Sequence, residues 1–305
     1  MKIKMKQIKK ILAANRSEIA IRIFRAAEES GIRTAAIYSK EDRFALHRYK
    51  TDESYLLKNN KGPIQAYLDI DSIIKIAKDA GVDAIHPGYG FLSESPEFAE
   101  ACNANGIIFI GPTPEILSKL GNKTEAINVV KNAKIKTIPS IIVGSQNSEE
   151  ISNAVEKIGY PIMIKASWGG GGRGMRVVYS KDELFNQINA AKSESKKAFG
   201  KDDIFIEKFL DDVAHIEVQI LGDSFGNIIH LYERDCSLQR RFQKIIEESP
   251  APKIEPAIIN KMAESAVSFA TNQKYEGAGT IEFIYDVDEK RFYFLEMNTR
   301  IQVEH

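Results

Sequence analysis

Short apolar runs alternate with amphipathic segments along the first third of the chain. The pattern predicts buried strands over residues 9–15 and 34–39 and, between them, a helix over residues 17–31 that Gly31 closes. The same order of strand, helix and strand returns over residues 82–112. Strands that alternate with helices pack as a parallel sheet with helices on its faces. An open parallel α/β sheet is therefore expected.

A dinucleotide-binding domain shows the same alternation. In such domains the first turn between strand and helix carries glycines that let a pyrophosphate approach the backbone. Here that turn is AANRSE, residues 13–18, which contains no glycine. We therefore set a nicotinamide-dinucleotide site aside.

The later parts of the chain are richer in strands. Expected strands cover residues 160–167, 175–180, 203–210, 215–223, 227–237, 277–287 and 290–305, and expected helices cover residues 181–199 and 256–273. These changes of pattern predict three domains, over residues 1–122, 123–210 and 211–305.

A run of glycines lies between two of these strands, in KASWGGGGRGM, residues 165–175. Because a strand enters the run and a strand leaves it, the glycines are expected at the tip of a hairpin rather than at the start of a helix. Glycine backbone N–H groups can lie over a triphosphate without Cβ atoms in the way. Lys165 and Arg173 can add positive charge. A surface hairpin without chemical function is the alternative.

The end of the chain predicts a metal site. Folding residues 279–298 around Asp288–Glu289 places Glu282 nearly opposite Glu296, with Asn298 on the same face. Carboxylate and amide oxygens suit Mg²⁺ or Mn²⁺ bound together with nucleotide phosphates. The same alternation continues this face through Arg300, Gln302 and Glu304. A solvated polar face is the alternative.

Other polar positions are weaker signals. His215, Glu217 and Gln219 share one face of a predicted strand, which is either solvated or a ligand site. The basic cluster QRRFQK, residues 239–244, is either an anion site or a solvated segment. His86 and Tyr89 lie where a parallel strand ends, the usual place for a ligand crevice.

Composition excludes several classes of function. Lys plus Arg and Asp plus Glu are both 42, so no overall field favours nucleic acid or an anionic membrane. The two cysteines, Cys102 and Cys236, lack the spacing of a disulfide scaffold or a zinc site. No apolar run has the length of a membrane span, and no targeting signal is evident. A cytoplasmic location is expected.

The motifs occur in the order found in one family. AANRSEIAIRIFRAAEE, HPGYGFLSE, KASWGGGGRGMRVV, ERDCSLQRR, GAGTIEF and EMNTRIQVEH resemble the biotin carboxylase family of ATP-grasp enzymes over essentially the whole chain. Ser17, residues 46–55, Trp168 and residues 198–203 are more similar to the pyruvate carboxylase branch than to the acetyl-CoA carboxylase subunit. The resemblance implies a Rossmann-like parallel α/β domain, a glycine-tipped lid and an incomplete antiparallel C-terminal lobe.

The resemblance also implies the reaction and its residues. ATP would phosphorylate bicarbonate to carboxyphosphate, which supplies CO₂ to biotin on a carrier domain outside this chain. The residues implied for ATP are Lys123, Lys165, Gly170, Gly171, Gly172, Glu207, Lys208, Leu210, His215 and Gln239. Those implied for magnesium are Glu282, Glu296 and Asn298; those for bicarbonate and biotin are Lys244, Arg300, Gln302, Val303 and Tyr89. Glu304 would be the general base and Arg300 would stabilise the biotin enolate.

Two departures from the family qualify these expectations. Phe242 stands where many relatives have histidine or asparagine, and relatives continue beyond His305 with a further arginine, a carboxyltransferase domain and a carrier domain. The chain is thus expected to be a fragment of a homo-oligomeric enzyme that converts pyruvate to oxaloacetate. The alternatives are a nucleotide-binding module without turnover, the biotin carboxylase component of an acyl-CoA carboxylase, and an ATP-grasp ligase for an amine or amino acid.

Overall fold

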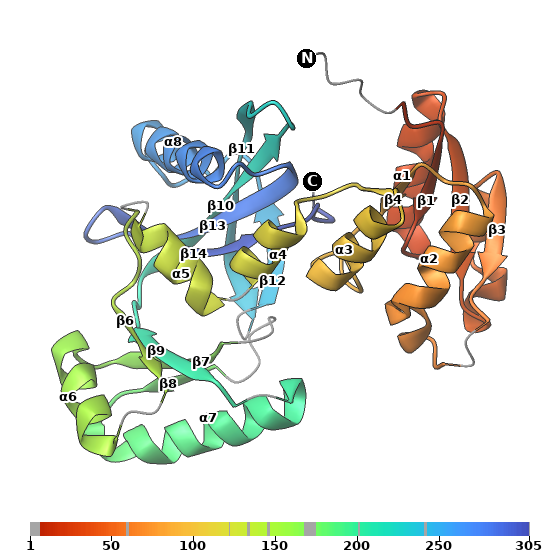
Figure 1. Ribbon diagram of the computed structural model, residues 1–305. Coiled ribbons are helices and arrows are strands. Elements are labelled where there is room, and N and C mark those ends of the chain that lie inside the picture. The colour runs from red at the N-terminus through yellow and green to blue at the C-terminus, as the bar shows by residue number, and fades with distance from the viewer. Residues whose placement is uncertain are drawn as a thin grey trace.

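The strands of the chain form separate sheets in separate lobes (Figure 1). The computed structural model describes residues 7–58, 61–121, 123–132, 135–144, 147–167, 175–200, 202–240 and 243–304. Within these residues there are three sheets, of which one is parallel and two are antiparallel. In Figure 1 the lobe with the parallel sheet lies at the right, and an extended link before α4 joins it to the rest.

The first lobe confirms the expected open parallel α/β sheet. Its strands have the order β3-β2-β1-β4-β5, and every neighbouring pair is parallel. The strands are β1 (Lys10–Ala13), β2 (Arg33–Tyr38), β3 (Glu53–Leu56), β4 (Ala84–His86) and β5 (Ile108–Phe109). The helices are α1 (Ser17–Glu29), α2 (Ile70–Asp79) and α3 (Pro96–Ala104), with 3₁₀ turns η1 (Glu41–Phe44), η2 (Leu46–Tyr49) and η3 (Gln65–Leu68).

Both faces of this sheet are buried because helices cover both. Leu12 of β1 packs in a cluster with Ile73 of α2 and Phe98 of α3. Its neighbour Ile11 points to the opposite face and packs with Phe24 of α1. This arrangement explains why the strands are continuous apolar runs in the sequence.

The second lobe contains the two strands on either side of the glycine run. Its strands have the order β6-β9-β7-β8, and β7 and β8 are antiparallel, as expected for the two arms of a hairpin. The elements are β6 (Ser140–Val143), α6 (Ser148–Ile158), β7 (Ile162–Ala166), β8 (Arg176–Val178), η4 (Lys181–Glu183), α7 (Leu184–Phe199) and β9 (Ile204–Lys208). The glycines themselves, with Trp168 and Arg173, lie outside the described residues.

The third lobe is an antiparallel sheet with helices against one face. Its strands have the order β12-β11-β10-β13-β14. They are β10 (Val213–Gly222), β11 (Ile228–Arg240), β12 (Gln243–Glu248), β13 (Gly277–Asp286) and β14 (Arg291–Asn298), and the helices are α4 (Pro114–Gly121), α5 (Lys123–Asn132) and α8 (Pro256–Asn272). Ile216, Val218 and Ile220 of β10 pack with Phe269 of α8 in the core of this lobe.

Two features of this sheet differ from the expectation. The strand predicted over residues 290–305 ends at Asn298, and the backbone of the next residue, Thr299, donates to the Glu94 carboxylate of the first lobe instead of to a neighbouring strand. In addition, the basic cluster forms the end of β11 and the start of β12, a strand that the apolar pattern did not reveal.

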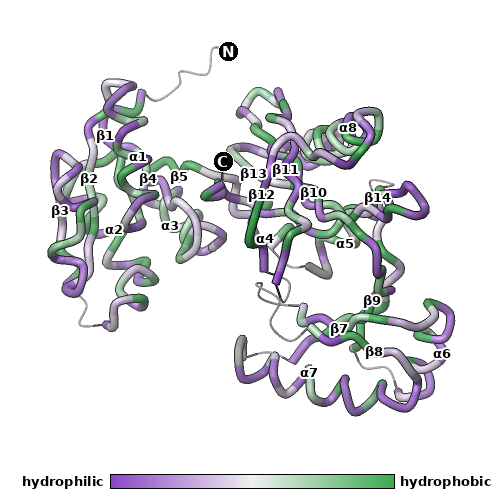
Figure 2. The backbone as a smooth tube through the Cα atoms, turned by 180° about the vertical axis from the view of Figure 1, so that it is seen from behind, coloured by the Kyte–Doolittle hydropathy of each residue, from purple (hydrophilic) through white to green (hydrophobic). Residues whose placement is uncertain are grey.

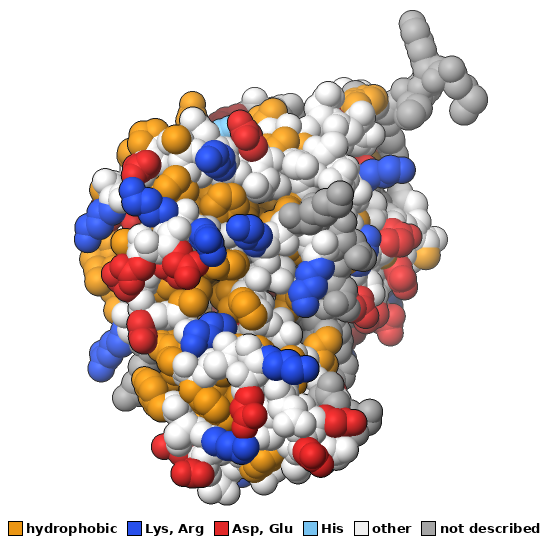
Figure 3. All heavy atoms as spheres, turned by 90° about the vertical axis from the view of Figure 1, so that its left-hand side faces the viewer, with side chains coloured by type: hydrophobic (Ala, Val, Ile, Leu, Met, Phe, Trp, Pro, Cys, Tyr) orange, Lys and Arg blue, Asp and Glu red, His pale blue; other side chains and the backbone are white. Residues whose placement is uncertain are grey.

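The surface agrees with the balanced charge of the sequence. Figure 2 shows α7 as largely hydrophilic, and on the face drawn in Figure 3 acidic and basic side chains are interspersed.

Within the described part of the chain, none of the helices has the length and apolar character to cross a bilayer. Cys102 and Cys236 are buried free thiols in different lobes.

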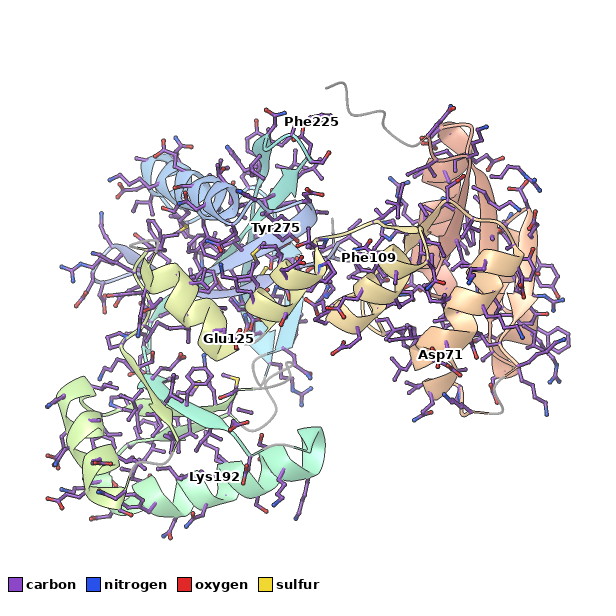
Figure 4. The ribbon with its side chains drawn as sticks, viewed as in Figure 1. Asp71, Phe109, Glu125, Lys192, Phe225 and Tyr275 are labelled. Atoms are coloured by element: carbon purple, nitrogen blue, oxygen red, sulfur yellow. The ribbon has the colours of Figure 1, made fainter. Side chains whose placement is uncertain are left out.

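Gly222→Ala is expected to destabilise the third lobe. A Cβ at Gly222 would lie 2.3 Å from the backbone oxygen of Tyr275, which is fully buried between α8 and the sheet (Figure 4). Overpacking of this kind costs roughly 1–3 kcal/mol. Thermal unfolding followed by circular dichroism should therefore show a midpoint lower by several degrees. Gly144→Ala, where an added Cβ meets nothing within 4 Å, is the matched control, and equal midpoints for the two variants would contradict the prediction.

Candidate active site

Three carboxylates lie side by side on one face of the antiparallel sheet. Glu217 of β10 is paired with Glu282 of β13, and Glu282 is paired with Glu296 of β14. Directly paired residues of antiparallel strands have their side chains on the same face. The register thus places Glu282 and Glu296 on the same face of the sheet. Glu217 and Glu282 are buried, so nearby positive charge or hydrogen-bond donors must compensate them.

Glu282 is the centre of a hydrogen-bonded cluster. His215 Nε2 lies 2.6 Å from Glu282 Oε2, and Asn298 Nδ2 donates to Glu282 Oε1 at 2.6 Å. The amide nitrogen of Gln239 donates to the Cys236 carbonyl at 2.8 Å and lies 2.7 Å from Nδ1 of His215. Because this amide nitrogen can only donate, Nδ1 accepts, and the imidazole proton is held on Nε2, facing Glu282.

Lys244 supplies the positive charge between two of the carboxylates. Its ammonium contacts Glu217 and lies 3.1 Å from Glu282 Oε1. Burial alone would lower the pKa of Lys244, but the charges of Glu282 and Glu217 outweigh it and raise the pKa. Burial likewise would raise the pKa of Glu282, but the hydrogen bond from His215 and the charge of Lys244 lower the pKa to about 2. Lys244 therefore stays protonated and Glu282 ionised.

The polar face of β10 is consequently not solvated. Glu217 and Gln219 are 0% and 1% exposed, while the alternating Ile216, Val218 and Ile220 fill the core on the other side. The burial argues against the solvated alternative for Glu217 and Gln219, whose partners are other residues of the protein. The basic cluster also has a definite place, since its Lys244 is held by carboxylates of β10 and β13 rather than by solvent.

The residues that follow β14, residues 299–304, form a terminal segment outside the sheet. The strand alternation invoked for Arg300, Gln302 and Glu304 is therefore wrong beyond Asn298. Side chains still bring the segment to the cluster: Arg300 Nη2 lies 3.5 Å from Asn298 Oδ1, and Gln302 Oε1 accepts from buried Arg234 at 2.7 Å. Val303 is 69% exposed.

The first lobe approaches the terminal segment through the HPGYGFLSE motif. Glu94 accepts from the backbone of Thr299 at 3.2 Å and from Nε of Arg300 at 3.3 Å. Tyr89 donates to Glu18; burial, this hydrogen bond and the charge of Glu304 raise the pKa of Tyr89 to about 12. Two motifs that are about 200 residues apart in the sequence thus meet.

His86 has a different role: burial lowers its pKa to about 4, and its Nδ1 accepts from the backbone of Gly88.

Some of the residues predicted around the nucleotide lie in the second lobe, whereas His215 and Gln239 lie in the third. Lys165 of β7 forms an ion pair with Glu207 of β9, and both are largely buried. Lys208 points elsewhere, donating to the carbonyls of Gly159 and Tyr160 at 3.1 and 2.9 Å. Leu210 follows directly after β9 and is partly exposed.

Several predicted positions fall outside what the structure describes. They are Gly170, Gly171 and Gly172, Phe242, His305 and the side chain of Lys123, whose backbone begins α5.

The donor set fits a hard divalent cation. Glu282 and Glu296 would contribute carboxylate oxygens and Asn298 an amide oxygen, and the register places all three residues on one face. His215, Glu217 and Glu282 also have ligand atoms within 4.8 Å of one another. Lys244 and His215 contact the Glu282 carboxylate in this structure. A cation that binds this carboxylate would therefore replace some of these contacts.

Sequence reasoning missed the residues that connect this cluster. Arg234 and Glu94 belong to motifs that were quoted, ERDCSLQRR and HPGYGFLSE, but neither was singled out. The available signal for Arg234 was a single arginine inside a strand of a predicted sheet. For Glu94 the chain offers no such signal, because its partners come from residues 299–300.

Comparison with known proteins covers the whole chain. Residues 7–117 match the family model described as biotin carboxylase, N-terminal domain. Residues 122–305 match the model described as carbamoyl-phosphate synthase L chain, ATP binding domain. The two models therefore divide the chain between them.

Individual relatives and solved structures agree with the match to the biotin carboxylase model. Pyruvate carboxylase of Bacillus subtilis is 53% identical over 98% of this chain, which spans 26% of that protein. Biotin carboxylase 1 of Bacillus subtilis is 48% identical over 98% of this chain, which spans 66% of it. The biotin carboxylase domain of Hydrogenobacter thermophilus 2-oxoglutarate carboxylase, solved with MgADP and bicarbonate, has a TM-score of 0.93 at 44% identity over 99% of this chain and 66% of its own.

Proposed function

Because the chain belongs to the biotin carboxylase family of ATP-grasp proteins, we propose that it carries out the ATP- and bicarbonate-dependent carboxylation of biotin. The reaction is the first half-reaction of a pyruvate carboxylase, in keeping with relatives of that name at 53% identity. The observation that carries the proposal is the convergence of Glu282, Lys244 and Asn298 beside the terminal segment. The chain spans about a quarter of its pyruvate carboxylase relatives, so carboxyl transfer to pyruvate belongs to other parts of such a protein.

The carboxylate face of the sheet would hold Mg²⁺. Glu282, Glu296 and Asn298 are the ligands, together with phosphate oxygens of ATP. When bound, Mg²⁺ neutralises charge that develops on the phosphates. The solved relative that contains MgADP supports this assignment. Mn²⁺ suits the same oxygen set.

The second lobe would hold the nucleotide. Lys165 would bind the phosphates together with Lys123 at the start of α5 and with Gly170, Gly171 and Gly172, which lie outside the described residues. The β9 end, with Glu207, Lys208 and Leu210, would border the adenine. His215 and Gln239 would lie beside the nucleotide at the edge of the third lobe. The side chain of Lys208 is bound to the carbonyls of Gly159 and Tyr160, so a role of this residue at the adenine would fall to its backbone.

The terminal segment would hold bicarbonate and biotin. A bicarbonate oxygen attacks the γ-phosphorus of ATP, ADP leaves, and carboxyphosphate forms; its breakdown gives phosphate and the CO₂ that N1′ of biotin attacks. Lys244 and Arg300 supply positive charge for bicarbonate, and Gln302 and the backbone near Val303 complete its site. Glu304 takes the proton of bicarbonate, Arg300 stabilises the enolate of biotin, and Tyr89 borders the biotin ring.

The natural full-length protein is expected to hydrolyse ATP only when bicarbonate is present, and faster with free biotin. Coupled measurement of ADP release, with and without each of the two, checks this. Calorimetry with MgATP on the same sample separates the nearest alternative, because binding without bicarbonate-dependent turnover identifies a nucleotide-binding module. Turnover that responds to an amine or amino acid but not to bicarbonate would instead identify another ATP-grasp ligase.

The partners follow from the same proposal. Biotin would arrive on a carrier domain and leave for a carboxyltransferase domain, and the complete enzyme would be a homo-oligomer. A biotin carboxylase component of an acyl-CoA carboxylase would share the half-reaction, since another relative is itself a biotin carboxylase. A cytoplasmic location stays a prediction.

A further inference from the structure

Arg234 is a buried arginine that reaches three parts of the third lobe. It lies in β11 and is 7% exposed. Its Nε donates to Glu217 at 2.5 Å and its Nη2 donates to Gln302 at 2.7 Å. Weaker contacts join Nη1 to Gln219 at 3.2 Å and Nη2 to Thr280 at 3.4 Å. One guanidinium thus connects β10, β13 and the terminal segment.

The acceptors around Arg234 are themselves fixed. The side-chain nitrogen of Gln219 donates to the carbonyls of Ile220 at 3.2 Å and Gly279 at 3.0 Å. Its Oε1 is therefore turned toward Arg234 and also accepts from Thr280 Oγ1 at 3.1 Å. Because a guanidinium is planar and its donors have fixed directions, preset acceptors determine its orientation. Arg234 in turn determines where Gln302 lies.

The terminal segment depends on such anchors because it has left the strand ladder. Arg234 holds its middle through Gln302, and Glu94 holds its start through Thr299 and Arg300. Arg300 and Glu304, the residues proposed to act on bicarbonate, are each two positions from Gln302. Displacement of the anchor would move both, and misplacement of reacting groups by about 1 Å can cost on the order of 10²-fold in rate.

Glu217 gives Arg234 a second connection to the site. The two oxygens of this buried carboxylate are divided, one to Arg234 and the other to Lys244. Arg234 therefore orients the carboxylate that holds the Lys244 ammonium. Both proposed bicarbonate-binding cations are thus tied to the same guanidinium, Lys244 through Glu217 and Arg300 through Gln302.

We propose that Arg234 is a positioning residue. Through its hydrogen bonds to Gln302 and Glu217, it sets the geometry of the bicarbonate site. The proposal rests on the proposed function, because that function gives the terminal segment its substrate. Lysine at this position keeps the charge but cannot reach acceptors on three elements at once. Arg234→Lys should therefore impair the site without removing a charge from the core.

The test compares Arg234→Lys with Arg291→Lys in the natural full-length protein. Arg291 is 57% exposed and pairs with Glu289 on the β13–β14 turn, so the same substitution there leaves the cluster untouched. For Arg234→Lys we expect the KM for bicarbonate to rise at least tenfold, with the dissociation constant of MgATP within threefold of the parent. An unchanged KM for bicarbonate, or equal weakening of both ligands, would overturn the proposal.

A double-mutant cycle with Gln302→Ala tests whether Arg234 acts through Gln302. If it does, the two substitutions together should raise the KM little more than either alone, since both release the same segment. If their effects multiply, Arg234 acts by another route and the proposed connection fails. Should Arg234→Lys not fold, Gln302→Ala alone must show the selective rise in KM, and its absence counts against the proposal.

Hydrogen exchange separates this proposal from the proposed function. If the parent protein shows no bicarbonate-dependent turnover, the proposed function fails, but anchoring by Arg234 is still measurable. Amide exchange within residues 299–304 should be faster in Arg234→Lys than in Arg291→Lys, and equal exchange would overturn the anchoring. A parent that turns over with an unaffected Arg234→Lys variant would overturn the positioning role alone.

Discussion

Glu282→Gln is expected to abolish most bicarbonate-dependent ATP hydrolysis. The substitution keeps the size of the side chain but removes its charge at the centre of the cluster, where His215, Lys244 and Asn298 all contact it. A divalent ion would lose a carboxylate ligand, and stabilisation worth several kcal/mol would be lost from the transition state. The fall in kcat should be on the order of 10²–10³-fold. Steady-state ADP release over a range of Mg²⁺ concentrations measures it.

The register of the hairpin supplies the controls for Glu282. Glu289→Gln, in the turn of the same hairpin, changes a side chain that is 54% exposed and should behave like the parent. Glu296→Ala should show the same loss of magnesium-dependent turnover as Glu282→Gln, because the two glutamates are directly paired. An unaltered Mg²⁺ dependence in both variants would mean that the metal lies elsewhere.

The hairpin could be predicted because its signals are local. Turn residues around Asp288 placed Glu282 nearly opposite Glu296, and the structure has that pairing, although it depends on a one-residue register shift between Glu282 and Phe283 that simple alternation does not predict. The same alternation misled beyond Asn298. The residue types continue to alternate, but the ladder stops at Asn298 and the backbone of Thr299 donates to Glu94 of another lobe. A local pattern of residue types carries no information about a hydrogen-bond partner that lies 205 residues away in the sequence.

The same limit explains what was uncertain about the site. The alternating sequence pattern of β10 is the same whether water or protein covers the polar face of the strand. The deciding residues, Arg234 and Lys244, come from β11 and β12, and the pairing of these strands with β10 is not encoded next to Glu217. The sequence therefore identified the members of the cluster through motifs, whereas the connections between them required the fold.

Lys244→Met is expected to lower kcat by about 10²-fold or more, since loss of one preorganised donor from an active site has that effect. Lys244 contacts Glu217 and Glu282 in this structure, so it can serve in two ways. It can face bicarbonate directly, as proposed, or it can only neutralise the two carboxylates. ADP release at saturating MgATP measures the loss, and Lys253→Met, an exposed lysine of the same lobe, is the control.

The double variant Lys244→Met/Glu217→Gln distinguishes the two roles. Removing Lys244 alone leaves two buried carboxylates with less positive charge, which destabilises the fold and confuses the kinetics. Glu217→Gln removes one negative charge and restores the balance among Arg234, Lys244, Glu217 and Glu282. If Lys244 faces bicarbonate, the double variant should regain thermal stability but not kcat. Recovery of both would show that the ammonium is needed only to hold Glu217 and Glu282 together, and the bicarbonate site would then rest on Arg300.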